Sequence, residues 1–273
     1  MTSTDDSEVP DYAGLLRLDD RAVVVLGAGQ GIGRQAAHAV ASMGARTYCV
    51  DKDGQLATEI AAEVGGLAGS GDVTRRDEVG RLFAEAEAGL GRIDGVVDIV
   101  GIARWMDLID MDDDTWDSQF DVCLRHAMLA MQAGARAMTR SGGGSMAFVA
   151  SVSGMYAAPR HGAYGAAKAG LMALVKTGAI EFAPLGIRVN AVAPGMTATP
   201  RALAAATATS RAEQEAVVPT GRLNRPSEIA SALLFFLSDL SSNVTGQTLV
   251  VDGGVAAKFP YRSQMGAARP AGA

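Results

Sequence analysis

Short apolar runs alternate with longer amphipathic segments along most of the chain. The run at residues 22–26, Ala-Val-Val-Val-Leu, is apolar on both faces, which is typical of a strand buried in a parallel sheet. Similar runs lie at residues 46–50, 67–71, 93–100, 146–150, 187–193 and 248–251. Helical patterns separate them, ending near residue 43 and covering residues 55–64, 77–89, 164–183 and 226–240. This alternation predicts an α/β fold, a doubly wound parallel sheet flanked by helices.

Residues 111–139 have the pattern of one long helix. Three aspartates at 112–114 place negative charge at its start, and Phe120, Leu124, Met128 and Met131 recur at helical spacing. Glycines at 142–144 end the pattern. We assign its methionines to the core or to a subunit interface.

No internal repeat and no linker divides the chain, so we expect one domain. It should span residues 17–254, after a disordered N-terminal arm at residues 1–16 and before a C-terminal tail at residues 255–273. Residues 199–219 are rich in Ala and Thr and lack a firm period, which favours a mobile lid over a site.

Composition narrows the classes of partner. The chain has 273 residues, a net charge of -6 and a pI near 5.1, and no basic cluster, so nucleic acid is excluded as the expected partner. No apolar run is long enough for a membrane span, and the polar N-terminus lacks the features of a signal peptide. Cys49 and Cys123 lie in segments predicted to be buried, which favours free thiols and a cytoplasmic location.

A glycine-rich turn follows the first predicted strand and precedes a helix. Its sequence is Gly27-Ala-Gly-Gln-Gly31-Ile-Gly33, a GxxxGxG spacing. Glycines let backbone N–H groups approach a pyrophosphate, whose charge is stabilised at a helix N-terminus. Tight packing alone is the alternative explanation of such a turn.

Asp51 ends the second predicted strand, eighteen residues after Gly33. A carboxylate at this place can accept hydrogen bonds from both hydroxyls of an adenosine ribose and would repel a 2′-phosphate. No Lys or Arg precedes Gly31 in the turn, which points the same way. We therefore predict NAD as the cofactor, the alternative being a solvated aspartate at a strand end.

Tyr164 and Lys168 are four residues apart in a predicted helix, so they share one face. An ammonium close to a phenol stabilises the phenolate, which suits Tyr164 to act as a general acid and base. Ser151, thirteen residues before the tyrosine, ends a predicted strand, at the edge where ligands bind in open α/β sheets. Its hydroxyl could hold the oxygen on which charge develops.

Four separated motifs resemble those of the short-chain dehydrogenase/reductase family, over about residues 18–254. They are the glycine turn, Ser151 with Tyr164-x-x-x-Lys168, the segment Asn190-Ala-Val-Ala-Pro194-Gly195, and the segment from Thr245 to Gly254. The resemblance implies a seven-stranded Rossmann sheet, a nicotinamide cofactor, and hydride transfer with an alcohol or carbonyl. It also implies a homotetramer, or a dimer, with the helices from Met111 and Tyr164 at an interface.

The resemblance also places a cofactor site on this chain, with Ser151, Tyr164 and Lys168 as catalytic residues and no metal. Lys168 would bond the nicotinamide ribose as well as assist the tyrosine. The cofactor-binding residues implied are Gly27, Gln30, Gly31, Ile32, Gly33, Asp51, Asp72, Val73, Ile99, Gly101, Tyr164, Lys168, Pro194, Gly195, Thr197 and Thr199.

Three positions depart from the family pattern. Leu26 stands where the family usually has Thr, and Asp98-Ile99-Val100-Gly101 stands where it has Asn-Asn-Ala-Gly, so hydrogen bonds there must be replaced or lost. Cys123 stands where the family has an Asn that supports a water between the lysine and solvent. A thiol is a weak hydrogen-bonding group, so the proton must travel by another route or more slowly.

Trp105, Met155, Tyr156 and Met196 flank the expected site and indicate a mostly apolar pocket. His161, three residues before Tyr164, could reach substrate or be an exposed turn residue. We predict an NAD-dependent oxidoreductase of apolar secondary alcohols and ketones. One alternative is a reductase of 3-oxoacyl thioesters on acyl carrier protein or coenzyme A, which Arg160 and Arg201 leave open. Another is a catalytically weak nucleotide-binding scaffold or sensor.

Overall fold

The computed structural model of the chain describes residues 8–258. The predicted arm falls partly outside this range, and so does most of the predicted tail. Within the range, Gly14–Leu16 form a single 3-10 turn before the first strand.

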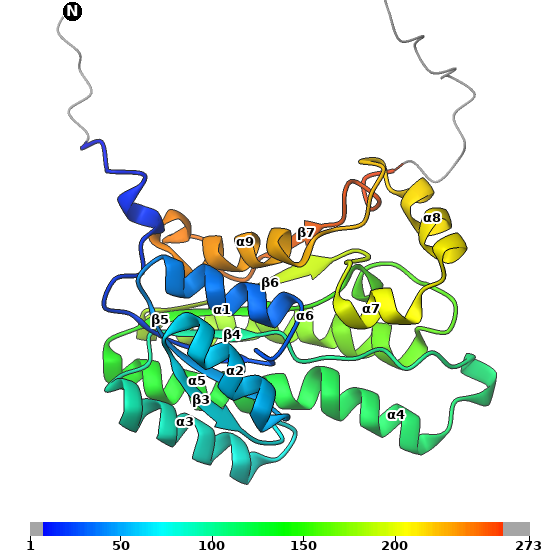
Figure 1. The fold of residues 1–273 in the computed structure, drawn as a ribbon. Coiled ribbons are helices and arrows are strands. Elements are labelled where there is room, and N and C mark those ends of the chain that lie inside the picture. Colours follow the sequence, from blue (N-terminus) through cyan, green and yellow to red (C-terminus); the bar gives the residue numbers. More distant parts are fainter. Residues whose placement is uncertain (1–7, 259–273) are drawn as a thin grey trace, which may run out of the picture.

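Seven parallel strands form one sheet in the order β3-β2-β1-β4-β5-β6-β7, as expected for a doubly wound Rossmann fold (Figure 1). The strands are β1 Ala22–Leu26, β2 Arg46–Asp51, β3 Leu67–Ser70, β4 Gly95–Asp98, β5 Gly144–Val149, β6 Ile187–Pro194 and β7 Thr248–Val251. The prediction of fold class is confirmed. Strand β4 covers residues 95–98 of the predicted 93–100, and just after it the carboxylate of Asp98 accepts a hydrogen bond from the N–H of Val100 at 3.0 Å.

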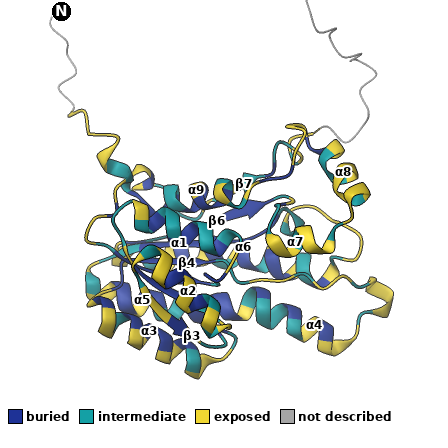
Figure 2. Ribbon diagram, in the orientation of Figure 1, coloured by how far each residue is buried: buried dark blue, intermediate teal, exposed yellow. Residues whose placement is uncertain are grey.

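Helices cover both faces of the sheet (Figure 1). Helices α1 Ile32–Ser42, α2 Gly54–Val64 and α9 Pro226–Leu237 pack on one face, and α3 Arg76–Leu90, α5 His126–Ser141 and α6 Gly162–Phe182 on the other. Figure 2 shows the strands buried between these layers. An apolar core lies on each face of the sheet, and successive residues of β1 point into opposite cores. Val24 faces the layer of α3, α5 and α6, while Val25 faces the layer of α1, α2 and α9. Each such buried side chain stabilises the fold by about 1.5–3 kcal/mol.

The long helix predicted for residues 111–139 is interrupted. Helix α4 Asp113–Phe120 runs into a π-helical turn at Asp121–Arg125 and only then into α5. The prediction of one continuous helix is wrong here because a single π turn barely changes the spacing of apolar residues. The wider turn contains Cys123, whose side chain is fully buried.

The predicted lid contains two short helices, α7 Pro200–Ala205 and α8 Ala208–Val217. Both begin with a threonine whose hydroxyl accepts a backbone hydrogen bond, Thr199 from Ala202 and Thr207 from Ser210. The remaining short turns are Leu108–Asp110, Val152–Gly154, Ala183–Leu185 and Asp239–Ser241.

Candidate functional site

Register brings the ends of the central strands to one edge of the sheet. Leu26 of β1 lies between Val50 of β2 and Asp98 of β4, and Asp98 lies beside Phe148 of β5. The predicted site residues come just after these paired positions. Gly27 follows Leu26, Asp51 follows Val50, and Ile99 follows Asp98, while Ser151 comes three residues after Phe148. All of them therefore lie at the carboxyl edge of the sheet. Strand order reverses between β1 and β4, and such a reversal is where open α/β sheets bind ligands.

The glycine turn has the geometry of an anion cradle. Gly31 is the N-cap of α1 with φ +59°, and Ile32 is the first helical residue, so their N–H groups stand where helix geometry leaves donors free. A Cβ at Gly33 would collide with the carbonyl oxygen of Gly27, and one at Gly31 would lie 3.3 Å from Thr199. Only glycines permit this close packing of turn, helix and the segment leading into α7.

Asp51 is fastened to the glycine turn. Its carboxylate accepts hydrogen bonds from the N–H of Gly29 at 2.9 Å and from the N–H of Asp53 at 3.1 Å. A Cβ at Gly29 would lie 2.6 Å from the Asp51 carboxylate, so this glycine makes room for it. The carboxylate thus stays at the flank of the cradle with acceptor capacity to spare, as an adenosine ribose requires.

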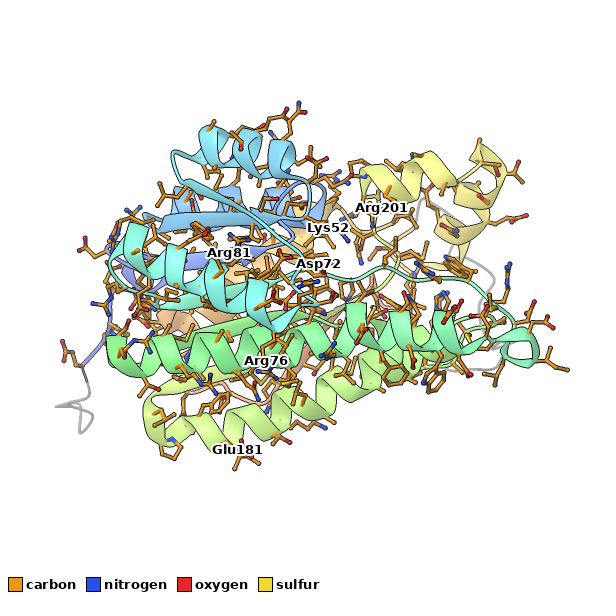
Figure 3. The ribbon with its side chains drawn as sticks, turned by 90° about the horizontal axis from the view of Figure 1, so that it is seen from below. Lys52, Asp72, Arg76, Arg81, Glu181 and Arg201 are labelled. Carbon is orange, nitrogen blue, oxygen red and sulfur yellow. The ribbon has the colours of Figure 1, made fainter. Side chains whose placement is uncertain are left out.

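Asp72 and Val73 follow β3 on the same flank. The carboxylate of Asp72 accepts hydrogen bonds from the hydroxyl of Thr74 at 2.7 Å and from the ammonium of Lys52 at 3.1 Å (Figure 3). These bonds, that of Thr74 first, hold the pKa of Asp72 below its ordinary value. Val73 is buried in the core. The ion pair with Lys52 had no signal in the sequence, because it joins two loops.

Ser151 and the helix with Tyr164 and Lys168 come together through backbone packing. The turn after Ser151 presses on α6: a Cβ at Gly154 would lie 2.7 Å from the backbone nitrogen of Ala169, and one at Gly165 would lie 2.8 Å from the carbonyl oxygen of Ser153. Small residues in α6 therefore serve this contact. The hydroxyl of Ser151 accepts a hydrogen bond from the N–H of Ser153 at 3.1 Å.

Lys168 is buried beneath this contact. Its ammonium donates to the carbonyl oxygen of Val149 at 2.7 Å and lies 5.9 Å from the centroid of the Tyr164 ring. A Cβ at Gly101 would come within 2.9 Å of the ammonium nitrogen, so a larger residue in this loop would have to displace the end of the lysine side chain. Lys168 thus lies between Gly101, the end of β5 and the ring of Tyr164.

The other predicted cofactor residues lie along the same edge. The backbone N–H of Ile99 donates to the carbonyl oxygen of Leu26 at 3.0 Å. Pro194 ends β6, and Gly195 packs so closely on Asp252 that a Cβ would lie 2.7 Å from its side chain. The hydroxyl of Thr197 donates to the carbonyl oxygen of Gly195 at 3.0 Å.

Asp98 and His126 form a buried pair that sequence reasoning missed. The carboxylate of Asp98 lies 3.1 Å from Nε2 of His126, and both side chains are 1% exposed. Their remaining polar atoms, Oδ2 and Nδ1, have no partner in the described structure. The lost family hydrogen bonds at Asp98 are thus replaced by bonds to His126 and to the N–H of Val100.

Cys123 lies nearby, with its sulfur 3.7 Å from the carbonyl oxygen of Ile102. Burial raises the pKa of this thiol, and the charge of Lys168 opposes the shift. Cys123 is therefore a neutral, weakly bonding group at the place of the family's asparagine. Cys49 and Cys123 are both buried and free.

His161 is half-buried at the start of α6 and is not an exposed turn residue. Its Nδ1 lies 2.8 Å from the hydroxyl of Ser153, and its ring packs against Trp105 with centroids 4.1 Å apart. The edge of its ring meets Tyr164 at a centroid distance of 5.6 Å. Burial lowers the pKa of His161, so the imidazole is neutral. Trp105, Met155, Tyr156 and Met196 each expose between 42% and 54% of their surface around this end of the molecule.

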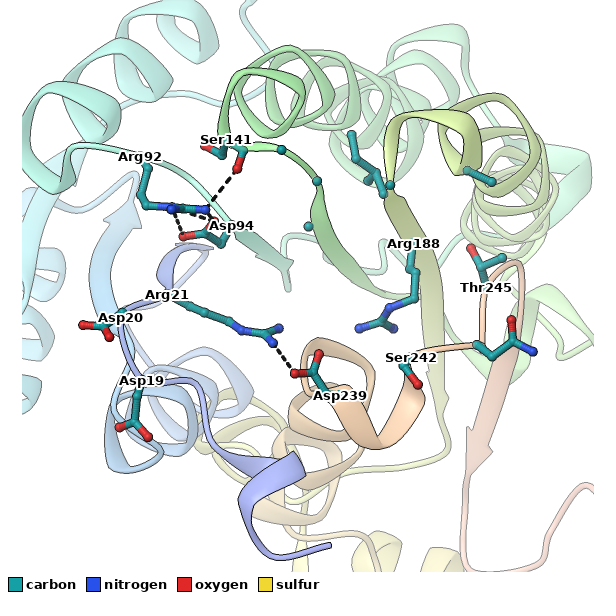
Figure 4. Close-up of a pocket in the computed structure, with 17 residues that line it drawn as sticks. Asp19, Asp20, Arg21, Arg92, Asp94, Ser141, Arg188, Asp239, Ser242 and Thr245 are labelled. Atoms are coloured by element: carbon teal, nitrogen blue, oxygen red, sulfur yellow. Dashed lines mark hydrogen bonds and ion pairs between the residues drawn. The ribbon is translucent and has the colours of Figure 1, made fainter. Parts of the chain in front are cut away.

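A separate cavity of about 640 Å³ lies at the opposite, amino edge of the sheet (Figure 4). Four of its charged side chains form two ion pairs: Arg21 with Asp239 at 2.5 Å, and Arg92 with Asp94 at 2.6 Å. Arg188 donates to the carbonyl oxygens of Phe236 and Ser238 at the end of α9. Arg21 and Arg188 thus tie the starts of β1 and β6 to the end of α9, at the edge opposite the candidate site.

Within residues 8–258, no three His, Cys, Asp or Glu side chains are grouped in a way that could hold a metal ion. Over the same residues, no helix combines the length and the apolar character that crossing a bilayer demands.

Known proteins resemble this chain over most of its length. The family model described as "Enoyl-(Acyl carrier protein) reductase" matches residues 27–256. The 3-oxoacyl-[acyl-carrier-protein] reductase of Thermotoga maritima is 36% identical over 88% of this chain and 99% of its own. Galactitol 2-dehydrogenase (L-tagatose-forming) of Cereibacter sphaeroides is 36% identical over 89% and 98%.

The fold is similar as well. A solved 7α-hydroxysteroid dehydrogenase, in complex with NADH and 7-oxo glycochenodeoxycholic acid, superposes with a TM-score of 0.85 at 29% identity, over 90% of this chain and 98% of that one. The matched family model and the relatives above 30% identity both cover the greater part of this chain. The chain belongs to the short-chain dehydrogenase/reductase family of oxidoreductases.

Proposed function

We propose that the protein transfers hydride between NAD and an apolar secondary alcohol or ketone. The observation that carries this proposal is the packing of the turn after Ser151 against the helix of Tyr164 and Lys168, at the carboxyl edge that also holds the glycine cradle and Asp51. The relative solved with NADH and an oxo steroid supports both the cofactor and the class of substrate.

The residues fit a nicotinamide dinucleotide. The N–H groups of Gly31 and Ile32 would hold the pyrophosphate, Asp51 the adenosine ribose, and Lys168 the nicotinamide ribose. The bound cofactor supplies the hydride acceptor for oxidation and the hydride donor for reduction.

Tyr164 moves the proton in this proposal. In oxidation its phenolate takes the proton of the substrate hydroxyl as the hydride leaves the same carbon, and in reduction it returns a proton to the carbonyl oxygen. The ammonium of Lys168 stabilises the phenolate. The hydroxyl of Ser151 holds the substrate oxygen by a hydrogen bond that strengthens as charge develops.

The test is a panel of secondary alcohols and ketones followed at the absorbance band of NADH. Tyr164→Phe should still gain thermal stability from NADH but lose turnover by about a hundredfold or more. The matched control is Tyr12→Phe, a change at an exposed tyrosine outside the site, which should leave turnover unchanged. Full turnover by Tyr164→Phe would remove the tyrosine from this role.

A 3-oxoacyl-thioester reductase is the second candidate, favoured by the relative from Thermotoga maritima. Turnover of acetoacetyl thioesters, without turnover of simple ketones, would select it. A nucleotide-binding scaffold is a third candidate, favoured by the weakly bonding Cys123. The scaffold would be supported if the wild-type protein binds NADH but turns over no substrate, and if Cys123→Asn restores turnover.

We also propose a cytoplasmic homotetramer. Trp116 of α4 and Ile180 of α6 are 39% and 77% exposed on the helices that the family resemblance places at an interface. Light scattering should give four times the chain mass of 28.0 kDa, or twice that mass for a dimer.

A further inference from the structure

His161 carries a polar atom that neither the fold nor the proposed proton transfer uses. Its Nε2 is shielded from solvent and has no hydrogen-bond partner in the described structure. Buried polar atoms without partners are uncommon in folded proteins, because each loses its bond to water. This one lies one helical turn before Tyr164, in a ring that contacts the Tyr164 ring.

The ring is held in one orientation. Nδ1 bonds the hydroxyl of Ser153 at 2.8 Å, and Ser153 belongs to the turn that packs on α6. Rotating the ring to satisfy Nε2 would break this bond. Nε2 is therefore presented in a fixed direction rather than left free to search for a partner.

The indole that packs on the His161 ring belongs to an exposed loop. Trp105 packs on His161 from a loop without helix or strand, and its side chain is 54% exposed. Polar contacts hold the loop on both sides of Trp105. The N–H of Arg104 donates to the side-chain oxygen of Gln119 at 3.1 Å, the guanidinium of Arg160 to the carbonyl oxygen of Trp105 at 3.2 Å, and the N–H of Met106 to the carbonyl oxygen of Arg160 at 3.2 Å. A ligand with an apolar body could replace the indole against the imidazole without breaking the core.

We propose that His161 binds a second oxygen of the substrate, so that the preferred substrates are secondary alcohols with a hydroxyl on the neighbouring carbon, and the corresponding α-hydroxyketones. This inference rests on the proposed function, since it assumes that Tyr164 receives the reacting oxygen. A neutral imidazole has one donor and one acceptor nitrogen, and Nδ1 uses one of these roles with Ser153. A hydroxyl both donates and accepts, so it satisfies Nε2 in either tautomer.

His161 takes no part in the transfer itself. Hydride leaves the carbinol carbon for NAD, and the hydroxyl proton of the same carbon goes to Tyr164, so the second hydroxyl keeps its proton. The role of His161 is to bind and orient. A site built to bond a hydroxyl rejects the analogue that lacks it, because its own buried polar group is then left unpaired.

The experiment compares matched substrate pairs with NAD: butane-2,3-diol against butan-2-ol, and cyclohexane-1,2-diol against cyclohexanol, each as separate stereoisomers. For the wild-type protein, kcat/KM should be about tenfold or more higher for one stereoisomer of each diol than for the matching mono-alcohol. His161→Ala should lower kcat/KM for the preferred diols mainly through KM and by about tenfold more than for the mono-alcohols, which removes the preference. Ser153→Ala, which keeps the ring but loses its anchor, should remove part of the preference.

His38→Ala is the matched control, because His38 pairs with Glu63 at an exposed position on α1. Thermal unfolding with and without NADH checks that each variant folds and binds cofactor. Equal turnover of diols and mono-alcohols by wild type, or equal losses for both classes in His161→Ala, would overturn the inference and leave the proposed function standing. Absence of turnover for every secondary alcohol would overturn both.

Discussion

Replacement of Asp51 by serine should change which cofactor the protein prefers. In the wild type the carboxylate lies at the flank of the glycine cradle, bonded to the N–H groups of Gly29 and Asp53. A 2′-phosphate bound there would bring a charge of about −1.5 to −2 close to this carboxylate. The Asp51→Ser substitution would remove the repulsion, while Lys52, whose side chain is 80% exposed, remains next in the chain as a cation.

The size of the effect follows from the charges. Two unit charges about 5 Å apart interact by about 3 kcal/mol at an effective dielectric constant of about 20. Asp51 is only half-buried and salt screens it, so about 1.5 kcal/mol should remain, or about a tenfold change in the ratio of kcat/KM for NADP to that for NAD. The loss of two backbone hydrogen bonds should lower the free energy of unfolding by about 1–3 kcal/mol.

The assay measures the ratio of kcat/KM for NADP to that for NAD, at low and at high salt, with Asp53→Ser as the control. Asp53 is the N-cap of α2 and accepts from the N–H groups of Gln55 and Leu56, a role that serine can fill. The Asp53→Ser substitution removes one negative charge two residues from Asp51 and leaves the contacts of the glycine cradle unchanged. The reasoning fails if wild type prefers NADP, if Asp51→Ser leaves the ratio unchanged, or if Asp53→Ser shifts it equally.

Two stability predictions accompany this one. Gly33→Ala should lower the free energy of unfolding by about 1–3 kcal/mol and weaken NADH binding, because the new Cβ must displace the Gly27 backbone. Denaturant unfolding measures the first effect and a thermal shift with NADH the second. If neither changes, the packing of Gly33 on Gly27 is contradicted. Glu228 accepts from the guanidinium of Arg222 at 2.6 Å, which with its other bonds lowers the pKa of Glu228 to about 2. A lowered folded-state pKa stabilises the protein above the ordinary value near 4.5, and this stability is lost as pH falls towards 2. Because the side chain is 33% exposed, Glu228→Gln should cost only about 1 kcal/mol at pH 7, a difference from wild type that should disappear in unfolding curves near pH 2; a gap that persists in acid would rule out the ionic origin.

The fold and the edge that holds the site could be predicted from the sequence because they depend on local signals. Strand β1 was expected at residues 22–26 and is Ala22–Leu26, since a run apolar on both faces fits little else than a buried parallel strand. The glycine turn and Asp51 lie directly after such strands, so their meeting follows from parallel pairing alone.

Contacts between distant segments could not be predicted in this way. Asp98 and His126 are 28 residues apart, and their bond depends on where α5 packs against β4. The place of His161 depends on the turn at Ser153 and on the loop carrying Trp105, neither of which has a periodic pattern. Sequence spacing put His161 near Tyr164, but only the packing distinguishes a buried, oriented imidazole from an exposed one.

The buried pair of Asp98 and His126 also constrains how this chain can diverge. Substitution of Asp98 by an apolar residue removes the partner of Nε2 and leaves a histidine with both ring nitrogens unbonded inside the core, at a cost of about 1–3 kcal/mol. Substitution of His126 by an apolar residue leaves the buried carboxylate with the N–H of Val100 as its remaining partner. The two positions should therefore change together whenever either becomes apolar, whereas asparagine at position 98 still offers Nε2 a partner and can coexist with the histidine.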